Sequence, residues 1–194
     1  MTSALSSLPV ARARSPWVGP VLRAVPALTV GLIITFTANH SPALGLSMLG
    51  AFGLATAVVL AVSTVLMSAG EPLKALNLGL AIIAALVGTL ALVALVMMGS
   101  GLAMLLLLVG GYAVLAGGLE LVWGIRHRGR HPFARDAVVI GVATLALAIV
   151  LALVGDPVSA VGFFGAYAVV LAVFLLIAGF SLKWSTPVKE STAS

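Results

Sequence analysis

Four long stretches of this chain contain no Asp, Glu, Lys or Arg. They cover residues 24–70, 75–119, 137–155 and 157–182, which together make up 137 of the 194 residues. Soluble domains carry charge on about a quarter of their residues, whereas here the fraction is 8% and 62% of the residues are apolar. A soluble enzyme or soluble nucleic-acid-binding domain is therefore excluded, and the sequence predicts an integral membrane protein.

The two longest stretches hold two membrane spans each. A bilayer core about 30 Å thick takes roughly 20 helical residues, and turn-forming residues interrupt these stretches at 39–42 and 99–101. No alternation of polar and apolar residues suggests a β-barrel, so helices are the spanning structure that remains. The predicted fold is all-α, with six transmembrane helices at 18–38, 42–67, 73–98, 102–125, 134–154 and 157–182 in a domain of residues 17–183.

The basic residues predict the orientation. With six spans, the ends of one membrane side hold Arg12, Arg14, Arg23, Lys74, Arg126, Arg128, Arg130, Arg135, Lys183 and Lys189, which are all ten basic residues. Basic residues mark cytoplasmic loops, so both termini are expected in the cytoplasm. Residues 1–16 are expected to form a disordered tail and 184–194 a C-terminal tail. The net charge of +5 is explained by topology and anionic lipid, with no nucleic-acid partner expected.

The sequence contains an internal repeat. VGTLAL at residues 87–92 is matched by VATLAL at 142–147, and the same offset of 55 places residues 110–114 on 165–169. The first two predicted helices form a weaker third copy. The helical-hairpin repeats therefore lie at about 17–70, 71–126 and 132–183. Each copy begins and ends on the same side, so the repeats are parallel. They differ from the inverted repeats of many secondary transporters.

The second helix of each hairpin carries a stripe of small residues. Small residues let helices approach closely in lipid, where apolar burial gives little drive for association. We therefore expect these helices to line the interior of the bundle. The predicted packing residues are Gly50, Gly53, Gly110, Ala113, Gly117, Gly124, Gly165, Ala168, Ala172 and Gly179. The aromatic residues Phe52, Tyr112 and Tyr167 are expected to form part of an aromatic belt.

Two charged residues lie inside the predicted spans. Glu120 is on the small-residue stripe, where the other copies have Leu60 and Leu175, and Arg23 is one turn into the first span. A charge inside the membrane costs about 2.5–3.5 kcal/mol on insertion scales. The main hypothesis is an ion pair between Arg23 and Glu120 that sets which hairpin lies beside which. Two alternatives remain open: Glu120 titrates in a proton or ligand path, or the two side chains snorkel to the interface.

The remaining polar residues predict little chemistry. Asp156 before Pro157 is interpreted as a helix N-cap, with a proton-sensing carboxylate as the alternative. The chain has no Cys and its three His lie in loops, so no metal, no cofactor and no catalytic residue is expected. The basic loop with Arg126, Arg128 and Arg130 is expected to bind anionic lipid headgroups.

Several of these motifs resemble the HdeD-like family of small bacterial inner-membrane proteins. They are the repeated hairpin, Arg23 at the start of the first helix, the Gly-x-Tyr-Ala-x-x-x-Gly pattern at 110–117 and the run at 119–126 before a basic loop. The resemblance spans roughly residues 17 to 183 and departs at Pro26. It implies a location in the bacterial inner membrane and a stress-related, acid-resistance role.

The expected function is a non-enzymatic structural or interaction role in the membrane. The alternative is a small channel or a proton-coupled transporter that uses Glu120. Expected partners are membrane lipids, together with a second copy of the chain or another membrane protein.

Overall fold

The computed structural model describes residues 17–68 and 70–184, and all regular structure in this part of the chain is helical. The predicted tails at 1–16 and 184–194 lie outside the described residues, except for Trp184, which is the last residue of α6. The helices are α1 (Val18–Phe36), α2 (Pro42–Val65), α3 (Pro72–Val93), η1 (Ala94–Met98), α4 (Leu102–Arg126), α5 (Ala134–Leu153) and α6 (Pro157–Trp184). Here η1 is a short π-helical continuation of α3. The all-α prediction is confirmed, and α6 extends two residues past its expected end.

Local signals explain where the helices begin and end. Pro42 and Pro157 each occupy the first position of a helix, where the missing N–H costs nothing, and each follows a capping residue. Ser41 accepts a hydrogen bond from the Leu44 N–H at 3.3 Å, and Asp156 accepts one from the Ser159 N–H at 2.9 Å. The N-cap interpretation of Asp156 is therefore confirmed. Hydrogen bonding from Ser159 also lowers the pKa of the Asp156 carboxyl below its ordinary value.

Six helices are long and apolar enough to cross a membrane, with α3 and η1 counted as one. Large apolar side chains such as Leu90, Ile149 and Val170 are more than half exposed on the outside of the bundle. Such a surface is stable against lipid hydrocarbon and unfavourable in water. The described chain is therefore a multi-pass helical protein whose outer surface suits a bilayer.

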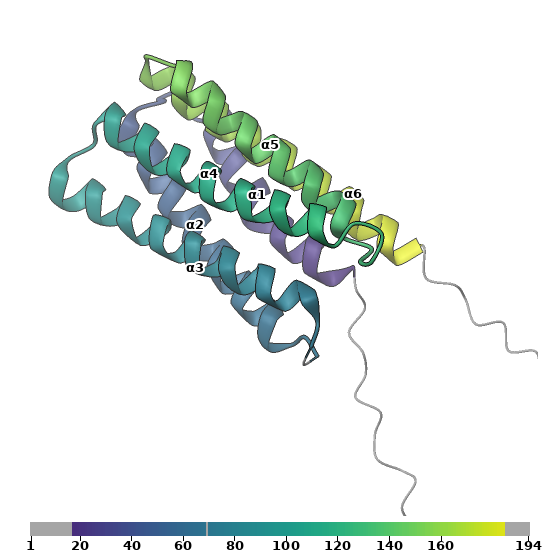
Figure 1. Cartoon of the computed structure of the whole chain (residues 1–194). Helices are drawn as coiled ribbons and strands as arrows, with labels where there is room; N and C mark the ends of the chain where they lie inside the picture. The colour runs from purple at the N-terminus through teal and green to yellow at the C-terminus, as the bar shows by residue number, and fades with distance from the viewer. Residues whose placement is uncertain (1–16, 69, 185–194) are drawn as a thin grey trace, which may run out of the picture.

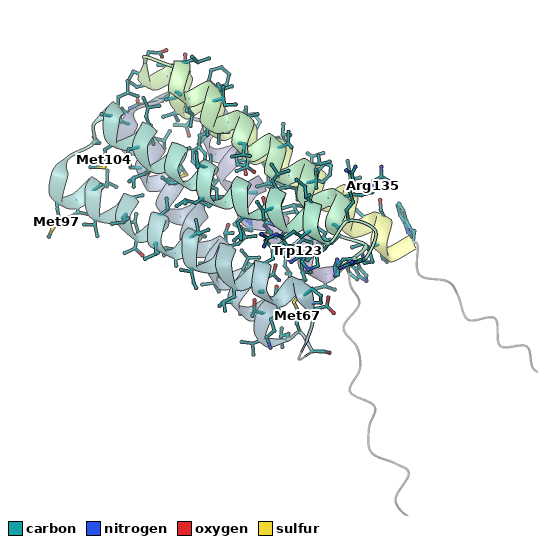
Figure 2. The ribbon with its side chains drawn as sticks, viewed as in Figure 1. Met67, Met97, Met104, Trp123 and Arg135 are labelled. Atoms are coloured by element: carbon teal, nitrogen blue, oxygen red, sulfur yellow. The ribbon has the colours of Figure 1, made fainter. Side chains whose placement is uncertain are left out.

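The two ends of the bundle differ in composition. The start of α1, the α2–α3 and α4–α5 connections and the end of α6 lie together at one end (Figure 1), which we call the basic end. Met67, Trp123 and Arg135 mark this end, and Met97 and Met104 mark the opposite end (Figure 2). All seven basic residues of the described segments lie at or within about two turns of the basic end.

The six helices form a closed ring of pairs. The most extensive packing joins α2 to α3, α4 to α5 and α6 to α1, whereas the two helices of each sequential hairpin share smaller interfaces. Helices α2, α4 and α6 also contact one another. These three therefore meet along the middle of the bundle, and each of the six helices also has an exposed face.

Close backbone contact occurs in each of the three large interfaces. A Cβ added at Gly53 would lie 2.6 Å from the Ala84 carbonyl oxygen, and one added at Gly141 would lie 2.6 Å from the Leu121 nitrogen. Backbone atoms cannot move aside as a side-chain tip can, so these crossings require glycine. The α6–α1 interface has the same character, because a Cβ at Gly31 would meet the Val169 nitrogen at 2.8 Å.

Aromatic rings fill the middle of the bundle. The Phe52 ring makes edge-to-face contacts with Tyr112 and Phe164, at centroid distances of 5.6 and 6.0 Å. Tyr167 is also buried, and its hydroxyl lies 2.8 Å from the Thr144 hydroxyl. Phe52, Tyr112 and Tyr167 therefore do not form an aromatic belt, and that prediction was wrong.

Candidate functional site

A buried ion pair lies between α1 and α4, toward the basic end. The Arg23 guanidinium Nη2 lies 2.5 Å from the Glu120 Oε1, and the two side chains are 7% and 1% exposed. The residues are 97 positions apart in sequence, and the fold brings them together as the pairing hypothesis expected. Snorkelling does not describe Glu120, since its carboxylate is enclosed by protein.

The ion pair breaks the threefold similarity of the three central helices. Leu60 on α2 and Leu175 on α6 are buried, and each occupies the repeat position at which α4 has Glu120. Tyr112 lies two turns away on α4 and is close enough to interact electrostatically with Arg23 and Glu120. A carboxylate beside two leucines is stable only with its cation present, because an unpaired buried charge is strongly unfavourable.

A cavity of about 370 Å³ leads from the basic end to Arg23. Its lining comes from the start of α1, the ends of α2 and α6, the start of α3 and the α4–α5 connection. Most of the lining is apolar, with Arg23, Leu60 and Leu175 among the deeper residues and Glu71 and His131 among the outer ones. Binding sites in helical bundles often have this character, in which a few polar groups lie among apolar walls.

An aromatic cluster anchors the α4–α5 connection beside this cavity. The Trp123 indole N–H donates to the Pro72 carbonyl at 3.2 Å, which ties the end of α4 to the start of α3. The Trp123 ring stacks on His127 at 4.5 Å and meets His131 edge-on at 5.2 Å. Both histidines of the basic loop are therefore packed against one tryptophan.

His131 also joins two connections of the basic end. Its Nδ1 accepts a hydrogen bond from the Phe133 N–H at 3.1 Å, and its Nε2 lies 3.0 Å from the Glu71 carboxylate. Because Nδ1 acts as an acceptor, the neutral tautomer with hydrogen on Nε2 satisfies both contacts. The α4–α5 connection is thus held to the α2–α3 connection without any need for a charged imidazole.

Most of the predicted packing residues lie at helix–helix contacts. A Cβ added at a contact glycine would come within 3.0 Å of a neighbouring helix, and the three alanines are completely buried. These residues are Gly50, Gly53, Gly117, Gly124, Gly165, Gly179, Ala113, Ala168 and Ala172. Gly110 is a correction, because a Cβ there would meet no heavy atom within 4 Å. Helix α4 turns that position away from its neighbours.

The basic loop lies where the sequence predicted. Arg126, Arg128 and Arg130 are exposed at the basic end, and no residue of this loop other than its histidines contributes to the Trp123 cluster. Their role at lipid headgroups stays a prediction.

Sequence reasoning missed four residues of this region. Trp123, His127 and His131 follow one another at four-residue spacing, which places the first two on one helix face and was a usable signal. Asn77 is a polar residue in an apolar run, and it is 7% exposed beside the cavity. Its amide makes one long contact, 3.7 Å from Nδ2 to the Met67 sulfur.

Within the described segments, no group of three or more His, Asp or Glu side chains is arranged to hold a metal ion. Comparison with known proteins found no matching family model, no matching curated protein and no matching solved structure.

Proposed function

We propose that this protein has a non-enzymatic structural or interaction role in the bacterial inner membrane, with both termini in the cytoplasm. The cyclic pairing of α1 to α6 supports three parallel hairpin repeats, because second helices meet at the centre and each packs on the first helix of the next hairpin. The concentration of basic residues at one end supports its cytoplasmic placement.

One observation carries this proposal over a conducting function. Away from the basic end, the centre of the bundle is filled by Phe52, Phe164 and aliphatic side chains such as Leu49 and Leu105, all at most 1% exposed. A channel needs polar groups or water along its whole length. The cavity at the basic end stops at the level of Arg23, so it does not form a path across the bundle.

A structural or interaction role in the membrane agrees with the resemblance to HdeD-like stress proteins. That resemblance rests on the hairpin repeat and the short motifs around Gly117 and Glu120. An acid-survival comparison tests it: a source strain that lacks the protein should survive acid challenge less well, and the wild-type chain should restore survival. Equal survival of the two strains would remove the stress role and leave the structural proposal standing.

Proton-coupled transport is the second candidate, because the cavity at the basic end reaches Arg23, the ion-pair partner of the enclosed Glu120 carboxylate. Proton flux into liposomes that contain the purified chain separates the two functions. We expect flux equal to that of empty liposomes for both the wild type and Glu120→Gln. Wild-type flux that Glu120→Gln abolishes would establish the transport function and overturn the structural one.

A further inference from the structure

A second hollow adjoins the cavity at the basic end. It is a groove of about 330 Å³ between α1 and α2, lined on α1 by residues between Leu22 and Val30 and on α2 by Ala51, Ala55 and Val59. Leu22 borders both hollows. The deeper polar cavity and the apolar groove are therefore neighbours on the same side of α1.

The groove is apolar along its length. Its single polar side chain is Thr29, whose hydroxyl donates to the Val25 carbonyl at 2.9 Å and so offers no free hydrogen. From Leu22 to Val30 the helix rises about 12 Å, which approaches half of the hydrocarbon thickness of a bilayer. The dimensions and chemistry suit one acyl chain that enters from the leaflet at the basic end.

The cavity offers hydrogen-bond donors above this groove. Arg23 is 93% buried, and Glu120 occupies its Nη2. Its Nε has no hydrogen-bond partner among the described residues, and a guanidinium has five N–H donors in all. The Nε is enclosed by protein, so an oxygen acceptor in the cavity would meet the part of the guanidinium that lines the cavity wall.

The charge of this end favours an anionic acceptor. The described segments place seven basic side chains and three acidic ones here, the acidic ones being Glu71, Glu120 and Asp136. Glu120 neutralises Arg23 locally and Glu71 faces His131. The remaining excess lies on lysines and arginines elsewhere at the basic end, outside the cavity lining. Their field attracts anions to this side of the bundle.

We propose that the two hollows together form a binding site for one anionic phospholipid of the surrounding leaflet. One acyl chain lies in the α1–α2 groove, and a phosphate oxygen accepts a hydrogen bond from Arg23. The site is distinct from the exposed loop arginines, which contact headgroups without enclosing a lipid. This proposal adds a specifically bound lipid to the proposed structural role. It does not depend on whether the protein conducts protons.

Native mass spectrometry of the full chain in mild detergent tests the proposal. Equal amounts of dioleoyl phosphatidylglycerol and dioleoyl phosphatidylcholine are added, and we expect one phosphatidylglycerol to be retained with a preference of about tenfold. A diazirine on its acyl chain should form adducts with α1 or α2. Equal retention of the two lipids, retention of added oleate instead of phospholipid, or adducts confined to other helices would overturn it.

Two variants separate the groove from the headgroup contact. Ala55→Phe fills the groove and should lower lipid retention about tenfold, whereas Ala146→Phe, an exposed position on α5, is the matched control and should bind as the wild type does. The double variant Arg23→Gln with Glu120→Gln keeps the site neutral and should lose the preference for phosphatidylglycerol. If Ala55→Phe and Ala146→Phe lower lipid retention equally, the lipid does not occupy the groove. This comparison does not require the double variant to fold.

Discussion

Arg23 and Glu120 illustrate how one pair of side chains constrains a bundle of small and apolar residues. Each charge alone costs about 2.5–3.5 kcal/mol inside a membrane, and the two are buried against one another. The fold satisfies both because the Arg23 side chain reaches Glu120 on α4, although α1 packs mainly on α6 and α2.

The substitution Glu120→Gln removes the partner of Arg23 and should destabilise the fold by about 3–5 kcal/mol. Thermal unfolding of the purified protein in detergent measures this. The double variant Arg23→Met with Glu120→Leu should recover most of the loss, because no uncompensated charge remains. A melting temperature of Glu120→Gln equal to that of the wild type would show that the ion pair is not structural.

The ion pair was predictable because each residue breaks an apolar pattern at a comparable depth of the membrane. The His131 contacts were not predictable in the same way. They depend on where the α4–α5 connection crosses the start of α3, and a loop conformation carries no periodicity from which to infer it. Tyr112 and Tyr167 were wrongly predicted at the lipid interface, because a tyrosine at a given depth fits either a lipid interface or a hydrogen-bonded interior.

At the scale of helices, the glycines of α4 and α5 differ sharply in their surroundings. Gly141→Ala should lower the melting temperature, because the new Cβ would lie 2.6 Å from the Leu121 nitrogen and 2.8 Å from the Gly117 carbonyl oxygen. Gly110→Ala is the matched control and should raise stability by up to about 1 kcal/mol through helix propensity. Thermal unfolding of both variants checks the prediction, and a shift of the same sign in both would contradict the crossing geometry.

The start of α6 should respond to pH through Asp156. Hydrogen bonds from Ser159 hold its pKa below the ordinary value, so the stabilisation is complete above the unfolded-state pKa of about 3.9. It is lost as the pH falls through the lower folded-state value. Asp156→Asn keeps a capping side chain and should remove this dependence. Melting temperatures between pH 7 and pH 3 provide the measurement, and parallel curves for the two proteins would refute it.

Helix ends were predicted closely, since Pro42, Pro157 and Gly99 act through local backbone chemistry. Pairing between helices was less accessible. The small-residue stripes show which helices approach closely, but Gly110 belongs to its stripe by spacing and lies away from the neighbouring helices. Spacing defines a face of a helix, and only the packed bundle determines how much of that face is covered.

For the whole molecule, the orientation in the membrane is the property most directly open to test. The natural chain has no cysteine, so Ser68→Cys and Ser100→Cys introduce single exposed thiols at opposite ends of the bundle. A membrane-impermeant maleimide should label Ser100→Cys in intact cells and Ser68→Cys only after the inner membrane is opened. The reverse result would place the basic end outside the cytoplasm.

The ring of helix pairs also affects how the protein is made. Helix α1 packs most extensively on α6, and Arg23 is translated 97 residues before Glu120. At about 5–20 residues per second, that separation corresponds to roughly 5 to 20 seconds of synthesis. During that interval the Arg23 guanidinium lacks its Glu120 partner. The large interface of α1 is completed by α6, which is the last helix to be synthesised. The α1–α6 interface therefore cannot form until the final span has been synthesised.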